Sequence, residues 1–150
     1  MHSLALLGLL AVLIPGDPPV SWSFVSTPME DGTTALEMRA HLEAGWHIYA
    51  TQLENDLGPI PTTITVHSSE GFKTSGELVE PEPEEVYDQN FQMNVRYHSG
   101  EPLFVQHVKV TSSTPVVIEG EVEYMVCNDK TCLPPTIAPF RLEVKPSAPK

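Results

Sequence analysis

The sequence predicts an all-β fold, an immunoglobulin-like antiparallel β-sandwich with one acidic loop. Three observations favour it. Apolar and polar residues alternate at period two along most of the chain, turn residues separate the short apolar segments, and no stretch shows a convincing 3.6-residue period. The 15 prolines, against 9 glycines, also disfavour long helices. About seven or eight short strands spaced by turns are typical of a sandwich rather than a barrel.

The first expected strand covers residues 36–42, where Leu, Met, Ala and Leu alternate with Glu, Arg and His. After a turn at residues 43–45, a second strand runs over 46–50, again with an apolar residue at every other position. A loop rich in Gly and Pro precedes the third, 64–66. The remaining expected strands show the same alternation: around Phe72, then 78–79, 93–97, 103–110, 116–127 and 140–144.

Length and charge limit the class of protein. A chain of 150 residues with 41% hydrophobic residues has room for one domain with a real core. The formal net charge is -12 and the sequence pI is about 4.7. Nucleic acid and anionic membrane both attract basic proteins, so neither is expected as a partner.

An apolar N-terminal segment stands apart from this domain. Residues 4–14 are almost unbroken apolar, close to the length of a secretory h-region and shorter than the roughly 20 residues of a membrane helix. No Lys or Arg precedes the segment and no Ala-x-Ala follows it, so a strand or core helix is the alternative. We expect a secretory signal at 1–20, the domain at 21–145 and a tail at 146–150, with no stable membrane span in the mature form and an oxidising compartment around it.

The stretch between Glu77 and Asp88 interrupts the alternation. It holds six acids and no base, and Pro81 and Pro83 disfavour a regular strand, so a loop is predicted. The loop ends in Tyr87-Asp88-Gln89-Asn90-Phe91, with two aromatic residues in a polar segment. Such aromatics either tuck back onto their own domain or cover or bind something, and both interpretations stay open.

Cys127 and Cys132 are the only cysteines. Two thiols do not close a zinc site, and none of His47, His98 and His107 lies at ligand spacing from them, so no metal is expected. A disulfide between them would close a loop of about six residues and contribute roughly 2 kcal/mol on the chain-entropy model, less than a bridge between distant strands.

Alternate residues of a strand point to opposite faces, and Cys127 shares a face with Glu119, Glu121 and Glu123. Unless a bulge intervenes, Cys127 is therefore expected to project away from the core. An exposed pair in a short loop suits thiol-disulfide exchange, although a hairpin clasp is the alternative. The spacing differs from Cys-x-x-Cys, and Pro134 and Pro135 exclude a following helix. The acidic surroundings, Asp129 included, should raise the thiol pKa.

Four segments together resemble the N-terminal periplasmic domain of the thiol:disulfide interchange protein DsbD. They are Gly45-Trp46-His47-Ile48-Tyr49-Ala50, Gly58-Pro59-Ile60-Pro61-Thr62, the 87–91 segment quoted above, and Tyr124-Met125-Val126-Cys127-Asn128-Asp129-Lys130-Thr131-Cys132-Leu133-Pro134-Pro135. The resemblance runs from about Val20 to Val144. The cysteine motif with its two prolines is the most specific part.

The resemblance implies a periplasmic domain of immunoglobulin-like fold that acts as a protein-disulfide reductase-type electron relay without a cofactor. The implied donors are membrane and thioredoxin-like redox proteins, and the implied recipients are periplasmic disulfide isomerases or cytochrome c maturation thiol proteins. Cys132 would form the mixed disulfide and Cys127 would resolve it. A cap loop would shield the pair, with Phe91 as the shield, Tyr87 as a second candidate, and Asp88 and Asn90 beside them. Tyr49, Tyr124 and Pro134, from the matching segments, are the supporting residues.

The chain departs from this family in two ways. The gap between the cysteines is four residues, where some members have five, and the membrane and thioredoxin-like portions do not occur in this chain. Its donor would therefore be a separate protein, or the chain is a fragment of a longer one.

Two other function classes remain open at this point. One is a non-enzymatic binding module whose disulfide clasps a hairpin. The other is Cu(I) handling by the cysteines with Met93, Met125 or His98, since thiolate and thioether are soft ligands.

Overall fold

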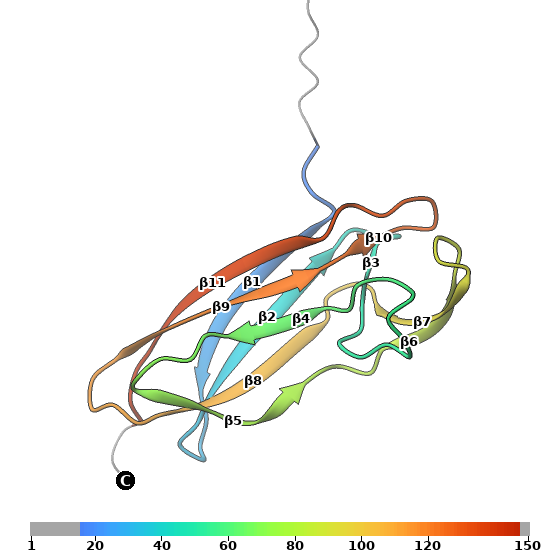
Figure 1. The fold of residues 1–150 in the computed structure, drawn as a ribbon. Coiled ribbons are helices and arrows are strands. Elements are labelled where there is room, and N and C mark those ends of the chain that lie inside the picture. The colour runs from blue at the N-terminus through green and yellow to red at the C-terminus, as the bar shows by residue number, and fades with distance from the viewer. Residues whose placement is uncertain (1–15, 148–150) are drawn as a thin grey trace, which may run out of the picture.

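The chain folds as an antiparallel β-sandwich in the computed structural model, which describes residues 16–147 (Figure 1). In that range the secondary structure consists of strands and contains no helix, hence none long and apolar enough to cross a membrane. The strands are β1 (Val20–Pro28), β2 (Thr34–Leu42), β3 (His47–Tyr49), β4 (Thr63–Val66), β5 (Phe72–Val79), β6 (Glu84–Asp88), β7 (Met93–His98), β8 (Leu103–Val110), β9 (Val116–Tyr124), β10 (Val126–Cys127) and β11 (Thr136–Val144). The predicted fold class is confirmed.

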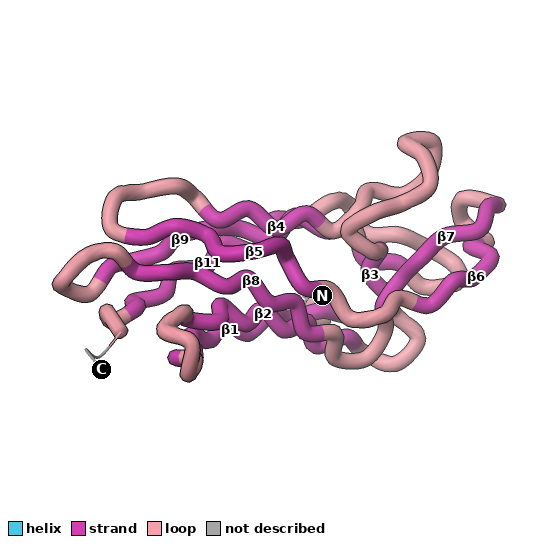
Figure 2. The backbone as a smooth tube through the Cα atoms, turned by 90° about the horizontal axis from the view of Figure 1, so that it is seen from below, coloured by secondary structure: helices cyan, strands magenta, loops and turns pink. Residues whose placement is uncertain are grey.

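The strands form three sheets, and every described pairing is antiparallel. Their orders are β1-β2-β8-β5, β11-β9-β4 and β10-β3-β7-β6. The first two contain the long strands and pack face to face over the central core, and the third lies at one end of the molecule (Figures 1 and 2). That end carries the cysteines.

The central core is rich in aromatic side chains. Phe104 on β8 is fully buried, and Trp22 on β1 contacts it with ring centroids 6.0 Å apart. Trp22 also lies 5.6 Å from the ring of Tyr124 on β9. Inward-facing apolar residues therefore alternate along both sheets, as the period-two pattern predicts.

Strand β1 is an addition to the predicted set. It pairs with β2 along its whole length, from Val20 opposite Leu42 to Pro28 opposite Thr34. Its Trp22 and Phe24 are half-buried against the core. The strand begins at Val20, the last residue of the segment expected as a secretory signal, and most of that segment, residues 1–15, lies outside the described residues.

The expectation of a loop over the whole acidic stretch is wrong at both ends, because Glu77–Val79 belong to β5 and only the residues between Val79 and Glu84 form a loop. After Pro83 the chain forms β6, which pairs with β7 from Glu84 opposite Tyr97 to Asp88 opposite Met93. Both prolines precede the first residue of β6, so neither removes a hydrogen bond from the β6–β7 ladder. What projects from the sheet is a β6–β7 hairpin whose tip is residues 89–92.

The chain changes sheet at Met125. Up to Tyr124, β9 pairs with β11 and β4, and from Val126 on β10 pairs with β3. Cys127 lies opposite His47 in that short ladder. This transfer places the cysteines beside the β6–β7 hairpin, whose tip and the β10–β11 loop approach each other in Figure 1.

Candidate functional site

Cys127 and Cys132 form a disulfide, with an S–S distance of 2.07 Å, across a tight turn. Within the turn Asn128 N–H donates to the Thr131 carbonyl at 2.9 Å. The side-chain oxygen of Asn128 accepts hydrogen bonds from the N–H groups of Lys130 and Thr131, each at 2.9 Å. An Asn side chain that satisfies N–H groups two and three residues later is a common device of turns. Asn128 therefore fixes the backbone that joins the two cysteines.

The two cysteines differ in exposure. Cys132 is half-buried, whereas Cys127 has an exposed fraction of 0%. The expectation that Cys127 is exposed is therefore wrong. The prediction that Cys127 points away from the central core is confirmed, since Val126 packs into that core and Cys127 packs into a different cluster. Cys127 is buried in a cluster that includes Tyr49 of β3, Met125, and side chains of the β6–β7 hairpin.

A shell of side chains surrounds the disulfide. Its buried members are Tyr49, Val95 and Cys127, and its half-buried members are Leu53, Val86, Phe91, Met93, Tyr97, Met125 and Cys132. We call these ten residues the cysteine shell. Phe91 comes from the hairpin tip and meets the ring of Tyr49 edge-on, with centroids 6.1 Å apart. The hairpin thus adds an aromatic side chain to the cluster that holds both cysteines.

Asp88 fixes the hairpin tip. Its side chain is buried and accepts hydrogen bonds from the N–H groups of Asn90, at 2.8 Å, and Phe91, at 3.1 Å. The hydroxyl of Tyr49 donates to the other carboxylate oxygen at 2.5 Å. One carboxylate therefore joins the tip to β3, and it sets the backbone from which Phe91 projects.

His47 lies beside this carboxylate in a buried polar cluster. Its Nε2 atom is 3.2 Å from the Tyr49 hydroxyl and 3.7 Å from Asp88 Oδ2. Burial lowers the pKa of His47, and the nearby carboxylates of Asp88 and Asp129 offset only part of that effect. Burial, together with the hydrogen bond to Asp88, raises the pKa of Tyr49. Both side chains are therefore neutral near pH 7 and act as hydrogen-bonding groups.

A single side-chain hydrogen bond connects the hairpin tip directly to the cysteine turn. The amide nitrogen of Asn90 donates to the backbone carbonyl of Asn128 at 2.8 Å. Asn90 is exposed, so water competes for this bond, and its net contribution is about 1 kcal/mol. The bond holds the hairpin tip against the cysteine turn, and breaking it costs little free energy.

The structure brings some of the predicted site residues together and separates others. Cys127, Cys132, Phe91 and Tyr49 lie in the cysteine shell, Asp88 hydrogen-bonds to it, and Asn90 hydrogen-bonds to the cysteine turn. Tyr87 is 55% exposed and lies outside the shell. Tyr124 packs in the central core against Trp22. Pro134 is exposed, two residues after Cys132.

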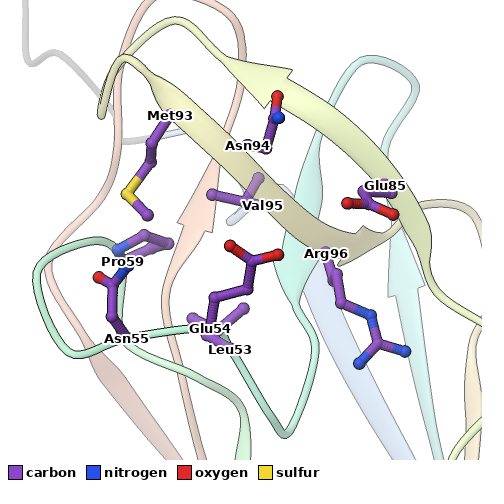
Figure 3. A pocket seen from close by; sticks show the side chains of 9 residues that line it. All are labelled: Leu53, Glu54, Asn55, Pro59, Glu85, Met93, Asn94, Val95 and Arg96. Carbon is purple, nitrogen blue, oxygen red and sulfur yellow. The ribbon is translucent and has the colours of Figure 1, made fainter.

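Of the residues considered as copper ligands, Met93 and Met125 belong to the cysteine shell, whereas His98 lies outside it. The side chain of Met93 extends toward the loop at Gly58 and Pro59 (Figure 3), and a Cβ atom added to Gly58 would lie 2.7 Å from its sulfur. His98 is hydrogen-bonded to Glu80 at 2.7 Å. Among residues 16–147, no group of three or more His, Cys, Asp or Glu is placed to hold a metal ion.

The shell reaches the surface on a second side. A small pocket opens between the 53–59 loop and β7 (Figure 3). Leu53, Met93 and Val95 form its apolar wall and belong to the cysteine shell. Part of the cysteine shell therefore borders the surface here, away from the central core.

Sequence reasoning missed three contributors to the site. His47 was considered only as a metal ligand, although its position opposite Cys127 makes it a neighbour of the disulfide. Asn128 appeared only within the motif, although Asn one residue after a strand is a recognisable turn signal. Val95 is one of several inward-facing apolar residues, and nothing in the sequence distinguishes the cluster it joins.

Comparison with known families and structures gives one result that covers nearly the whole chain. The family described as "Thiol:disulfide interchange protein DsbD, N-terminal" matches residues 17–143. No curated protein sequence matches the chain significantly.

Solved structures of similar fold include the reduced N-terminal domain of DsbD from Neisseria meningitidis, at 15% identity and a TM-score of 0.55, covering 90% of this chain and 96% of that one. The N-terminal periplasmic domain of ScsB from Proteus mirabilis matches at 15% identity and a TM-score of 0.60, covering 91% of this chain and 51% of that one. A complex of the DsbD and PilB N-terminal domains from Neisseria meningitidis matches at 13% identity and a TM-score of 0.57, covering 91% and 94%.

Proposed function

The chain belongs to the family of DsbD N-terminal domains, and from that premise we propose that it is a periplasmic thiol-disulfide exchange domain. In this proposal the Cys127–Cys132 pair relays reducing equivalents from a membrane or thioredoxin-like donor to periplasmic thiol proteins. The observation that carries the proposal is the position of the disulfide. It lies in the cysteine shell at one end of the sandwich, beside a hairpin tip and outside the central core.

The difference in exposure supports distinct roles for the two sulfurs. A donor thiolate attacks Sγ of Cys132, the half-buried cysteine, and a mixed disulfide forms while the Cys127–Cys132 bond breaks. Cys127 leaves as the thiolate and takes a proton. A second donor thiol then displaces Cys132, so the donor becomes a disulfide and the domain gains two electrons as two thiols.

Delivery to a recipient reverses this sequence. The Cys132 thiolate attacks the recipient's disulfide and forms a mixed disulfide, and one recipient thiolate is released. Cys127 then attacks Cys132, which restores the domain's disulfide and releases the second recipient thiol. The buried position of Cys127 beside Cys132 suits this resolving step, because an external thiol has no direct access to it.

Access controls the reaction in this proposal. Phe91 covers the cysteine shell, and the tip that carries it is held by Asp88 and by the Asn90–Asn128 hydrogen bond. A docked partner displaces the tip and reaches Cys132, whereas a small thiol has to wait for spontaneous opening. Shielding by Phe91 keeps the pair unreactive toward unrelated thiols.

Thioredoxin-like proteins are the partner class we propose as donors. The similar structure from Neisseria meningitidis is a complex of the DsbD N-terminal domain with the PilB N-terminal domain, which supports a protein partner for this fold. Recipients would be periplasmic disulfide isomerases or cytochrome c maturation thiol proteins. The periplasmic origin of the ScsB domain supports the same compartment for this chain.

A trapping experiment tests the relay. With Cys127→Ser, the mixed disulfide on Cys132 has no resolving thiol, so incubation with a periplasmic extract should accumulate covalent complexes that a reductant dissolves. The matched control is Cys132→Ser, which should trap little because Cys127 is buried. If only Cys132→Ser traps partners, the roles are reversed, and if neither does, the relay is refuted.

The second candidate function is a binding module with a structural disulfide, and the full burial of Cys127 is the observation that favours it. Redox titration separates the two. A structural bridge should have a potential below about -300 mV, whereas an exchange site should be more easily reduced.

A further inference from the structure

Strand β6 leaves one backbone edge open beside the cysteines. It is the terminal strand of the β10-β3-β7-β6 sheet, and β7 occupies its other side (Figure 2). Within residues 16–147, no backbone hydrogen bond outside the β6–β7 ladder involves residues 84–88. Every second N–H and C=O of the strand is therefore free to pair with another extended chain.

The charge of this edge favours one kind of partner. Glu82, Glu84 and Glu85 are exposed, and no base occurs from Glu77 to Asp88. A second copy of this chain would bring the same acids to the edge, and like charges facing each other across a strand pair are destabilising. The acidic edge therefore disfavours self-pairing and admits a strand that carries Lys or Arg.

The edge also leads toward the disulfide. Val86 belongs to the cysteine shell, so a chain paired with β6 would lie next to it. A small hollow lies between β6, the hairpin tip and the cysteine turn. The exposed Asp129 lines that hollow, so it presents a carboxylate to a side chain entering from the edge.

We propose that the open edge of β6 is a strand-addition site for an extended, basic segment of the partner thiol protein. The proposal rests on the exchange function above and specifies how the partner docks. Main-chain hydrogen bonds to β6 give affinity, Lys or Arg side chains near Glu82, Glu84 and Glu85 give selectivity, and the docked segment brings its thiol to the hairpin tip.

Binding is tested first without any redox step. The probes are three capped six-residue peptides: alternating Lys and Val, alternating Glu and Val, and the Lys/Val peptide methylated on alternate backbone nitrogens. Added to the oxidised, isotope-labelled protein, the Lys/Val peptide should slow amide exchange at residues 84–88. We expect it to bind roughly tenfold tighter than the Glu/Val peptide. The methylated peptide keeps the charge but loses strand pairing, so it should give no protection.

A charge-reversed variant localises the effect. Glu82→Lys combined with Glu85→Lys alters two exposed side chains that make no hydrogen bond or ion pair with the other described residues. It should abolish the preference for the Lys/Val peptide. The matched control, Glu30→Lys with Glu143→Lys, makes the same charge change near the opposite end and should keep the preference.

Other results overturn the strand-addition site. Equal binding of the methylated and unmethylated peptides would mean that charge alone attracts them. Concentration-dependent protection of β6 without peptide would mean that a second copy occupies the edge. Absence of protection by the Lys/Val peptide would exclude the site outright.

The same peptides extended by a cysteine separate this proposal from the exchange function. If the Lys/Val peptide protects β6 but no thiol reduces the disulfide, the docking site stands and the relay fails. If all thiol peptides reduce the disulfide at one rate and none protects β6, the relay stands and the docking site fails. Both proposals together require the Lys/Val thiol peptide to react fastest.

Discussion

The central core and the cysteine shell meet at consecutive residues of β10, yet they are stabilised in different ways. The core lies between strands of eight or nine residues and is filled by aromatic and aliphatic side chains. The shell lies mainly on shorter strands of two to six residues, and buried polar groups connect it to the hairpin tip: His47, Tyr49 and Asp88. Val126 belongs to the core and Cys127 to the shell.

This difference shows how one small domain combines a rigid frame with a site that opens. Long ladders and apolar packing contribute most of the free energy of unfolding and require no partner to maintain. The hairpin tip depends on a few side-chain hydrogen bonds, each contributing about 1–3 kcal/mol. Opening the tip therefore breaks a small set of contacts while the frame stays folded.

The largest expected effect is on the core. Phe104→Ala removes a fully buried ring and should lower the free energy of unfolding by about 3–5 kcal/mol, measured by urea denaturation. The rate at which a small dithiol reduces the native disulfide should hardly change, because the shell stays intact. Val25→Ala, at a 53% exposed side chain, is the control and should be nearly neutral. A loss below about 1 kcal/mol would contradict the conclusion that the central core contributes most of the free energy of unfolding.

Asp88→Asn should affect both stability and access. The variant keeps one oxygen acceptor, but its NH₂ group faces donors from Tyr49, Asn90 or Phe91, which leaves a buried hydrogen bond unmade. We expect a loss of about 1–3 kcal/mol in urea denaturation and faster reduction by a small dithiol.

Asp129→Asn is the matched control for this prediction, because Asp129 is exposed and the charge change is the same. If both variants speed reduction equally, repulsion of the thiolate rather than the hydrogen bonds of Asp88 controls access.

Phe91→Ala should open the shell with a smaller loss of stability. The ring is half-buried, so its removal should cost about 1–2 kcal/mol, and reduction by a small dithiol should become about tenfold faster. Tyr87→Ala removes an aromatic ring of similar size from the same hairpin, but at a 55% exposed site outside the shell. Its rate should stay within about twofold of the parent protein, and an equal gain for both variants would refute a specific shield at Phe91.

The smallest expected effect is a pH dependence of stability in the polar cluster. Because burial lowers the pKa of His47 in the folded protein, the unfolded chain binds a proton first as the pH falls through the ordinary value of 6.5. The free energy of unfolding should therefore decrease from pH 7.5 to 5.5. His47→Gln, neutral throughout, should flatten this dependence in urea denaturation, and His67→Gln, at an exposed site, should not. Identical pH profiles for both variants would contradict the role of His47.

Strand parity correctly assigned the faces of β9, where Val122 and Tyr124 are buried and Glu119 is exposed. It also placed Cys127 correctly on the face opposite the core. It did not predict the exposure of Cys127, because a second layer covers that face, and alternation along one strand contains no information about a hairpin about 30 residues earlier.

Strand β6 was missed for a related reason. An acid-rich pentapeptide after two prolines has low strand propensity, and it forms a strand because β7 offers it a backbone ladder and Val86 packs into the cysteine shell. Strand β1 has recognisable alternation at Trp22 and Phe24, and that signal was overlooked beside the apolar N-terminus.

The sequence by itself determined the all-β class, most of the strands, the family and the two cysteines, because period-two patterning and short motifs are local properties. Only the tertiary structure decided that one sulfur is buried and the other half-buried, that Phe91 rather than Tyr87 joins the shell, and that β6 has an open edge. Those features depend on contacts between segments far apart in the chain, where several registers satisfy the same local pattern and packing selects one.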